Sequence, residues 1–433
     1  MRKVIASVLA ASIVALAGCS TAKETTPKTG EQTPAKPVEL SFYFPVAVGG
    51  AAANALEAMV KEFNTANPNI KVTGNFSGNY TDTMTKVQAS IQGGAPVDSA
   101  ILLATDVYTL LDQKAIVAVD ELAKADKDGA EYLGDFLPAL MLNSKVDGKL
   151  WSVPFQRSVP VLFWNKETFT KNGLKDAPKN WDELVSSAKT LTKDGNWGVE
   201  IPSDGNPSWI FSSFSIQAGK SVVNENGTEV YLNTPENEKG IQFILDLAKT
   251  NKVMPAGVIK WGDAPNDFIA GKTAMIYHTT GSIGLLKSKM DPAKIGVAPM
   301  PAGVKPGAPT GGGNLYVFKT TPEKQAAAWK FVRFMTEPER VAQWSVTTGY
   351  IAASNKAWAT KTMKDAVAAF PGYAVAKDAL ANADRELATH NNQQILKAYG
   401  DELQAIVNGT KDVKTALKTA QENATKILAP FKK

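Results

Sequence analysis

The stretch 153–165, VPFQRSVPVLFWN, holds Gln156, Arg157 and Ser158 between two prolines. Amide, guanidinium and hydroxyl groups can hydrogen-bond a small polar solute. Because proline cannot donate a ladder hydrogen bond, we expect the first half of the stretch to be irregular, whereas the apolar run after it is typical of a short strand. We interpret the stretch as a crossover between two α/β lobes, with its polar side chains facing the gap between them.

The sequence contains none of the common catalytic motifs. Its histidines are His278 and His390, its only cysteine is Cys19, and it has no HExxH, no GxSxG and no Walker loop. A glycosidase needs only two carboxylates, so a secreted hydrolase remains the alternative function. A passive surface protein or adhesin is a third class, but it would not explain the crossover. We expect a binding protein without catalytic residues, cofactor or metal.

Four more side chains are candidates for contact with a solute. Tyr80 and the pair Thr105 and Asp106 follow expected strand ends, where α/β lobes bind ligands. Tyr80 could instead cap a turn, and Asp106 could be a helix N-cap. Trp209 follows Asn-Pro-Ser in a turn-rich stretch, and it could equally belong to the core or offer a stacking surface.

A run of three glycines, 311–313, precedes Asn314. Glycine permits close approach of the backbone to a ligand, and successive N–H groups can form an anion-binding nest. Glycine-rich segments are also commonly plain turns. The run is a weak indication of a site when taken alone.

The elements that would position these residues begin with a βαβαβ order. Alternating apolar residues predict a strand over 38–44, and later strands are expected at 70–72 and 100–104. The spacing of Leu56, Met59, Val60 and Phe63 predicts a helix between the first two strands, and a second helix follows Tyr80. This order favours a doubly wound α/β lobe.

The rest of the chain is long enough for a second lobe. At 433 residues it exceeds the usual size of one hydrophobic core, and its 44% apolar content is ordinary for a globular protein. Helices are expected at 180–191 and 236–248, a strand at 273–277 and another at 295–298. A mostly helical tail is predicted after Thr321, interrupted by a loop at 348–351.

The N-terminus has the features of a targeting segment. Arg2 and Lys3 precede an apolar run over 4–17 that is too short to span a bilayer as a mature helix. It ends in LAGC, which resembles the lipobox of bacterial lipoproteins and predicts lipidation at Cys19; the alternative is an ordinary secretory signal. We expect a signal peptide over 1–18, a disordered tether over 19–37, and no internal disulfide.

The charge of the chain gives no indication of nucleic acid. The formal net charge is +5, and residues of both signs are spread along the sequence without a long basic run. We therefore expect no nucleic-acid partner. Lipid attachment would make the membrane a partner through its anchor alone.

Several motifs together resemble one family. In order they are FNTANPNIKV, GNY, VPFQRSVPVLFWNKETF, APKNWDEL, FIAGKTAMIY, GVAPMP, GGGNLYVF and WKFVRFMTEPERVAQWSVTTGYIAAS. The chain resembles, from about Val38 to its end, the extracellular solute-binding proteins of bacterial ABC importers, and within them the carbohydrate-type group that includes glycerol 3-phosphate and glycerophosphodiester binders.

The resemblance implies an α/β, two-lobed periplasmic-binding-protein fold of type II, a Venus flytrap that closes on a solute. It implies a monomer that delivers a small hydroxylated solute, either a sugar or a glycerol phosphodiester, to permease subunits. It also implies three crossovers, near Ser158, Lys272 and Phe318. The expected lobes are 38–157 with 273–317, and 158–272 with 318–433.

Ligand contacts can be carried over by motif. Glycerol-phosphate binders contact their ligand through groups that fall here on Tyr80, Ser158, Thr280, Gly312 and Tyr350, and Trp209 matches a stacking tryptophan. An acidic side chain of the family has an approximate match at Thr105 or Asp106.

The chain departs from the family pattern at the group that grips phosphate. Where glycerol-phosphate binders have an arginine, this sequence has Leu396, with Lys397 one residue later. One residue along a helix turns by about 100°, and lysine lacks the bidentate fork of arginine. Arg157 is a possible substitute, but a salt bridge is as good an interpretation of it. A neutral sugar would fit these departures.

Overall fold

The computed structural model describes residues 36–46 and 51–432. The chain from Pro37 to Lys433 forms one compact unit. The expected signal peptide, Cys19 and nearly all of the tether lie outside the described residues. Within the described ranges, no helix combines the length and apolar character needed to cross a membrane.

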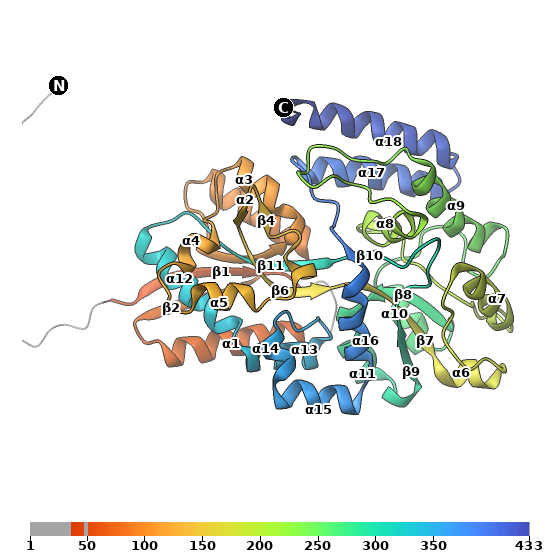
Figure 1. The fold of residues 1–433 in the computed structure, drawn as a ribbon, viewed down its shortest axis with the longest axis horizontal. Coiled ribbons are helices and arrows are strands. Elements are labelled where there is room, and N and C mark those ends of the chain that lie inside the picture. Colours follow the sequence, from red (N-terminus) through yellow and green to blue (C-terminus); the bar gives the residue numbers. More distant parts are fainter. Residues whose placement is uncertain (1–35, 47–50, 433) are drawn as a thin grey trace, which may run out of the picture. The chain divides into compact units, whose positions relative to one another are not determined.

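The first lobe is built on a five-stranded sheet in the order β2-β1-β3-β11-β6 (Figure 1). Strand β1 is parallel to β2 and β3, as the predicted βαβαβ order requires, and β11 is antiparallel to β3 and β6. Its strands are β1 (Val38–Phe44), β2 (Ile70–Phe76), β3 (Ser99–Leu103), β6 (Val153–Ser158) and β11 (Gly311–Val317).

The helices of the first lobe follow the apolar spacing of the sequence. Helix α1 buries Leu56, Met59, Val60 and Phe63 in the core, so this prediction is confirmed. Helix α12 packs against β1 and β11. The helices of this region are α1 (Ala52–Ala66), α2 (Tyr80–Gln92), α3 (Val107–Asp112), α4 (Val119–Ala123), α5 (Gly129–Gly134), α12 (Pro322–Met335), α13 (Pro338–Thr348) and α14 (Asn355–Ala359).

The first half of the crossover stretch is more regular than expected. Residues 153–158 form strand β6 despite Pro154. The strand lies at the edge of its sheet, where a missing N–H donor is tolerated, and its register with β11 shifts between Gly313 and Asn314. Pro160 occupies the first position of β7, which is also compatible with proline.

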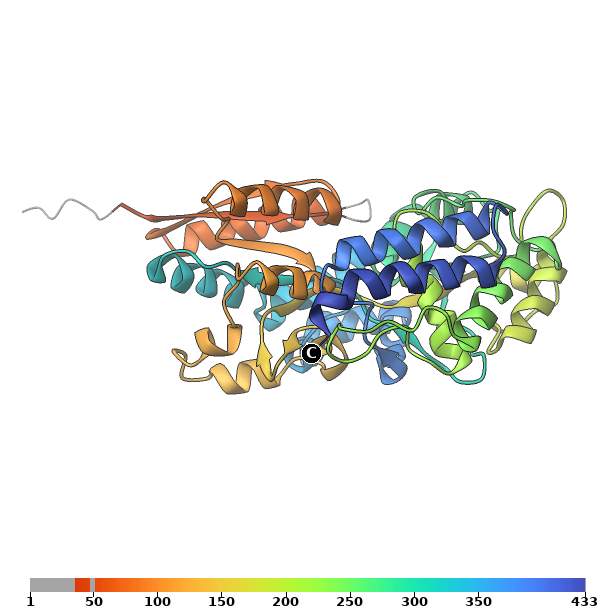
Figure 2. The same ribbon diagram turned by 90° about the horizontal axis from the view of Figure 1, so that it is seen from above.

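The second lobe is built on a three-stranded sheet in the order β8-β7-β9, with both pairings antiparallel. Its strands are β7 (Pro160–Asn165), β8 (Met275–Thr279) and β9 (Ile295–Ala298). Helices α17 and α18 lie side by side, and they pack on α8 and α9 (Figure 2). The helices of this region are α6 (Lys166–Lys171), α7 (Trp181–Leu191), α8 (Pro207–Ala218), α9 (Pro235–Lys249), α10 (Asp263–Ile269), α11 (Ile283–Lys289), α15 (Lys361–Ala369), α16 (Gly372–Asp378), α17 (Asn392–Val407) and α18 (Val413–Leu428).

Two expected lobe boundaries do not coincide with a change of sheet. The chain leaves the five-stranded sheet between Ser158 and Pro160, as predicted, and re-enters it between β9 and β11. Lys272 lies between α10 and β8, which contact each other within the second lobe. Phe318 bridges to Ile116, and α12 after it covers the first sheet. Helix-then-strand patterns recur in both lobes, so the sequence did not indicate which sheet each strand joins.

Two pairs of two-residue strands accompany the larger sheets. Strand β10 is parallel to β12 beside the passage from β9 to β11, and β4 is antiparallel to β5. Their bounds are β4 (Lys145–Val146), β5 (Lys149–Leu150), β10 (Ala308–Pro309) and β12 (Ala383–Asp384). The segment that follows β12 leads to α17.

Candidate ligand-binding site between the two lobes

A cavity of about 810 Å³ lies between the two lobes. This volume suits a solute of the size of a small sugar or glycerol derivative. Its lining comes from the helix and strand ends of both lobes. The lining residues that carry the argument are Tyr80, Thr105, Ser158, Trp209, Trp261, Thr279, Gly312, Tyr350, Glu386, Gln393, Leu396 and Lys397.

Two tyrosines lie on the floor of the cavity. Tyr80 begins α2, and the reciprocal capping bonds between Asn79 and Asp82 fix this helix end. Tyr350 follows Gly349, which ends α13 in a left-handed conformation, and its hydroxyl accepts a 3.1 Å hydrogen bond from Gln156 Nε2. The Tyr80 hydroxyl is buried and has no hydrogen-bond partner among the described residues. Burial and the nearby Tyr350 hydroxyl raise its pKa well above the ordinary value, so it is a neutral hydroxyl.

The three glycines make room for protein groups rather than forming a nest in a loop. They belong to β11, opposite Ser158, Arg157 and Gln156 of β6. A Cβ at Gly312, where φ is +93°, would lie 2.0 Å from the Gln156 carbonyl oxygen. A Cβ at Gly311 would lie 2.2 Å from the Trp209 ring, which explains why glycine is needed there.

An aromatic corner forms the second-lobe wall. Trp209 lies in the first turn of α8, where the sequence had suggested a turn-rich stretch, and its Nε1 donates a 2.7 Å hydrogen bond to the Thr310 carbonyl. The Trp261 ring lies 6.0 Å from the Trp209 ring at 58°. Behind it, the His278 ring lies 3.9 Å away, and burial lowers the pKa of His278 to about 4. The neutral imidazole therefore supports Trp261 rather than contacting the solute.

Asp106 lies behind the cavity wall, and Thr105 lines it. The Gln393 amide donates a 3.2 Å hydrogen bond to Asp106 Oδ1, while Asp106 Oδ2 and the Thr105 hydroxyl have no partner among the described residues. Burial raises the pKa of Asp106 to about 7. Asp106 is not an N-cap for α3 through its side chain. Thr105 therefore has an unpartnered hydroxyl at the cavity wall, and Asp106 has an unpartnered carboxylate oxygen behind it.

Arg157 does not line the cavity. Its buried guanidinium donates from Nη1 to the Gly312 carbonyl at 2.8 Å, and from Nη2 to Glu386 Oε1 at 2.7 Å and to Thr310 Oγ1 at 3.0 Å. Burial raises the pKa of Glu386, and the Arg157 charge opposes that shift. The salt-bridge interpretation of Arg157 therefore fits its surroundings, and the guanidinium is already paired.

The remaining candidates lie at or near the cavity. Ser158 and Lys397 line it, whereas Thr280 is buried behind it and its neighbour Thr279 lines it instead. The Lys397 ammonium pairs with Asp401 one helical turn away, at 2.8 Å. Leu396 also lines the cavity, so the position that holds arginine in the resembling family faces the site with an apolar side chain.

Sequence reasoning missed four of these lining residues. Trp261 and Glu386 stand in segments without a ligand-binding pattern, Gln393 stands three residues before Leu396 in the stretch where only the arginine position was considered, and Thr279 precedes the threonine that the motif selected. The tandem threonines of HTTGS could have indicated either residue. Glu386 carried no local signal, because its burial follows from a partner 229 residues away in the sequence.

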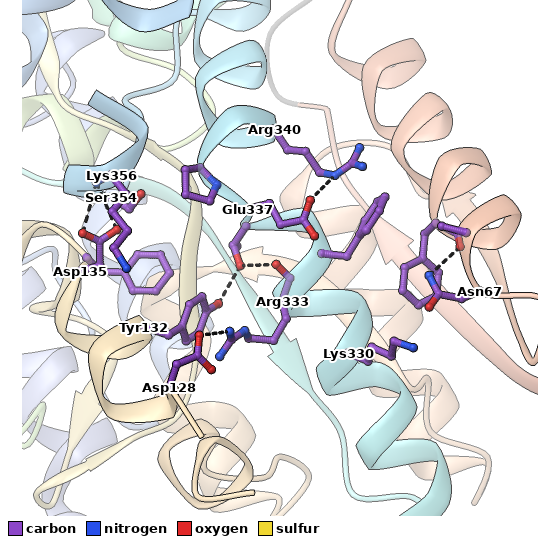
Figure 3. Close-up of a pocket in the computed structure, with 16 residues that line it drawn as sticks. Asn67, Asp128, Tyr132, Asp135, Lys330, Arg333, Glu337, Arg340, Ser354 and Lys356 are labelled. Carbon is purple, nitrogen blue, oxygen red and sulfur yellow. Dashed lines mark hydrogen bonds and ion pairs between the residues drawn. The ribbon is translucent and has the colours of Figure 1, made fainter. Parts of the chain in front are cut away.

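A second pocket, of about 480 Å³, lies on the first lobe between α1, α5, α12 and α13 (Figure 3). Its two arginines are paired with carboxylates. Arg333 bonds Asp128 at 2.7 Å and stacks over the Tyr132 ring, and Arg340 bonds Glu337 at 3.0 Å. The Tyr132 hydroxyl is bonded to Thr336. We call this the outer pocket; its polar groups offer little to a ligand.

Comparisons with known proteins agree with a solute-binding role. Residues 58–371 match the model of a bacterial extracellular solute-binding protein family. The chain is 29% identical over 413 residues to the sn-glycerol-3-phosphate-binding periplasmic protein UgpB of Escherichia coli O1:K1, covering 89% of this chain and 91% of that protein. The Salmonella paratyphi A protein of the same name is equally similar, with 29% identity over 413 residues. No hydrolase is among these relatives.

Solved structures share the two-lobed fold. UgpB from Mycobacterium tuberculosis in complex with glycerophosphocholine has a TM-score of 0.80 at 23% identity, covering 92% of this chain and 99% of that chain. Maltose-bound MalE3 of T. maritima has a TM-score of 0.79 at 23% identity, covering 90% of this chain and all of the other. These likenesses show the fold, and the family match covers more than half of the sequence. The chain thus belongs to the bacterial extracellular solute-binding protein family.

Proposed function

We propose that this protein is the substrate-binding component of an ABC importer, which captures a small hydroxylated solute between its lobes and delivers it to the permease. The solute class comprises sugars, oligosaccharides and glycerol phosphodiesters. The relatives named above are glycerol 3-phosphate binders, and the structural neighbours include complexes with glycerophosphocholine and maltose. The protein acts without catalysis and as a monomer.

The observation that carries the proposal is the set of unpartnered polar atoms around the interlobe cavity. The Tyr80 and Thr105 hydroxyls line the cavity and are buried without partners among the described residues. A buried polar group without a partner costs about 1–3 kcal/mol, and a hydroxylated solute would satisfy it. The Trp209 and Trp261 rings give the apolar faces of a sugar or glycerol unit a surface on which to pack.

A lipid anchor would hold the receptor at the outer face of the membrane. This part of the proposal rests on the LAGC sequence at Cys19, which lies outside the described residues. Fractionation of cells that express the natural chain or Cys19→Ala tests it. The anchored form should sediment with membranes, and the variant should not; membrane association of both would contradict the anchor.

A thermal-shift screen tests the receptor function. The chain from Pro37 onward, which forms one compact unit, is heated with glycerol 3-phosphate, glycerophosphocholine, maltose and longer oligosaccharides. At a ligand concentration about one hundred times Kd, binding adds about 2.7 kcal/mol to the free energy of unfolding, so Tm should rise by a few degrees. Turnover of any of these compounds by the pure protein would favour the hydrolase alternative instead.

A further inference from the structure

Glu386 is a buried carboxylate at the cavity wall that the family resemblance did not indicate. It lies in the segment between β12 and α17, and its side chain is 4% exposed. It lines the cavity. A carboxylate is rarely buried unless it is paired and hydrogen-bonded, so its position needs a reason.

Among the described residues, only one of the two carboxylate oxygens of Glu386 has hydrogen-bond partners. Its Oε1 accepts from Arg157 Nη2 at 2.7 Å and from Thr310 Oγ1 at 3.3 Å. The backbone N–H of Glu386 donates to Asn143 Oδ1 at 3.1 Å, which fixes the start of the side chain. Within residues 36–46 and 51–432, no hydrogen bond reaches Oε2. One oxygen is therefore held by the protein while the other remains for a group inside the cavity.

Arg157 holds this carboxylate with its terminal nitrogens, and only its buried Nε has no hydrogen-bond partner among the described residues. Its Nη1 donates to the Gly312 carbonyl and its Nη2 to Glu386 and Thr310, and the side chain has no exposed surface. The guanidinium cannot turn toward a solute without breaking a buried ion pair, which would leave a charge uncompensated. Arg157 thus compensates the charge of Glu386 and does not reach the cavity.

The described cavity wall offers an anion no cation that is not already paired with a carboxylate. Among the described lining residues, the acids are Glu386 and Asp401, and the one cation is Lys397. The Lys397 ammonium is exposed and already paired with Asp401. A phosphate beside Glu386 Oε2 would meet an oxygen that can only accept hydrogen bonds, and the Arg157 charge that offsets the carboxylate lies on its Oε1 side.

We propose that Glu386 is a specificity-determining residue, whose Oε2 accepts a hydrogen bond from a solute hydroxyl and repels phosphate, with Arg157 as its positioning residue. The inference rests on the proposed receptor function and narrows its solute class to neutral polyhydroxylated compounds such as sugars. Hydrogen bonds to an ionised carboxylate are stronger than those between neutral groups, so one such bond gives the site much of its selectivity.

Titration calorimetry of the wild-type chain from Pro37 onward tests the inference with maltose and maltotriose against glycerol 3-phosphate and glycerophosphocholine. We expect a neutral sugar to bind at least about tenfold more tightly than either phosphate compound. Equal or tighter binding of a phosphate compound would overturn the role of Glu386 and leave the receptor function standing. Binding of none of the four would overturn the receptor function for this solute class, and the inference with it.

The variant Glu386→Gln keeps the shape of the side chain and removes its charge. We expect it to bind the sugar about tenfold or more weakly and to reduce the preference for sugar over glycerol 3-phosphate. Because this substitution leaves the Arg157 charge without its partner, the double variant Arg157→Met with Glu386→Gln removes both charges and should show the same loss of preference. Unchanged sugar affinity in a folded variant would refute the proposal.

Glu402→Gln is the matched control. Glu402 is also a largely buried glutamate in an ion pair, with Lys411 at 2.7 Å, but it does not line the cavity. Its replacement should lower Tm without changing the ratio of the two dissociation constants. A change of that ratio as large as in Glu386→Gln would show that the effect comes from general loss of a buried charge, and would overturn the proposal.

Discussion

The interlobe cavity and the outer pocket are both lined by aromatic and charged side chains, but their polar groups are in opposite states. In the outer pocket, Arg333 and Arg340 are paired with carboxylates, and Tyr132 is bonded to Thr336. In the interlobe cavity, the Tyr80 and Thr105 hydroxyls have no partner among the described residues. The outer pocket is complete without a solute, and the cavity is not.

This difference indicates which hollow binds a ligand more reliably than volume or composition does. A protein that leaves buried polar atoms unpaired loses stability, unless a ligand supplies the missing partner. Removing an unpartnered polar atom of the cavity should therefore alter binding more than folding, and breaking a hydrogen bond of the outer pocket should do the reverse. Paired variants of the two regions can test this contrast.

The largest expected effect is at Gly312, where the neighbouring atoms leave no room for a side chain. Gly312→Ala would place a Cβ 2.0 Å from the Gln156 carbonyl oxygen at a φ of +93°. Overpacking and a strained backbone together should cost roughly 3 kcal/mol or more of the free energy of unfolding. Gly94→Ala is the control, because Gly94 has a φ of +73° with open space around it and should lose only about 1 kcal/mol. Equal losses by chemical denaturation would contradict the tight packing.

The second effect is the pH dependence of Asp106. Its pKa is about 7 in the folded protein and 3.8 ordinarily. As pH rises from about 4 to 7, the unfolded chain has lost this proton and the folded chain retains it, so the free energy of unfolding falls and then levels off above pH 7. Relative to Asp106→Asn, the wild type should lose on the order of a few kcal/mol.

Denaturation of the wild type and Asp106→Asn at pH 5 and pH 8 measures this difference. A stability difference between the two proteins that does not change with pH would be evidence against it.

The outer pocket should show the opposite pH dependence of stability, since Arg333 holds the pKa of Asp128 below its ordinary value. Stability from that pair is present at neutral pH and is lost as pH falls through the folded pKa of Asp128. Asp128→Asn should therefore change the pH profile only on its acid side.

Trp209 tests the aromatic corner. Trp209→Ala removes a ring that its Nε1 fixes to Thr310, and we expect the affinity for the bound sugar or phosphodiester to fall by around 1 kcal/mol or more. Arg340→Ala in the outer pocket should leave the dissociation constant unchanged. Unchanged affinity of Trp209→Ala would remove this residue from the site.

How much of this could be predicted from the sequence differs between the fold and the site. Apolar spacing identified β1 and α1, because burial of one face is a local property, and the helical segment expected after Thr321 begins with α12. The sheet membership of β8 could not be predicted, since both lobes use the same kinds of strand. Likewise, Pro154 suggested irregular backbone, and only the edge position of β6 explains why a strand tolerates it.

Tyr80, chosen because it follows an expected strand end, and Ser158 and Tyr350, chosen from the family resemblance, all line the cavity, and their contact with a solute stays a prediction. It was missed where the environment is made by distant segments. Glu386 acquires its role from Arg157, and Trp261 from His278 behind it. For Arg157, the sequence left ligand contact and salt bridge open, and its hydrogen bonds favour the salt bridge.

The smallest expected effects come from two matched Tyr→Phe changes. Tyr80→Phe removes a hydroxyl without a partner among the described residues, so stability should stay within about 0.5 kcal/mol while solute affinity falls by about 1 kcal/mol. Tyr132→Phe breaks the 2.7 Å bond to Thr336, so stability should fall by about 1 kcal/mol with affinity unchanged. Thermal unfolding and titration calorimetry on both variants measure these effects. If both variants lost affinity and stability alike, the proposed difference between the cavity and the outer pocket would be wrong.

The hydrogen bonds around Thr310 divide the cavity wall into residues that can be redesigned and residues that cannot. Trp209 and Arg157 both bond to Thr310, and Arg157 also bonds to Gly312 and Glu386, so each also holds the passage between the two sheets. Leu396 and Gln404 line the same cavity from α17, and their side chains make no hydrogen bond to the described chain. To engineer a receptor for a different solute, this face of α17 should therefore be varied first. Its side chains can change without disturbing the hydrogen bonds around Thr310.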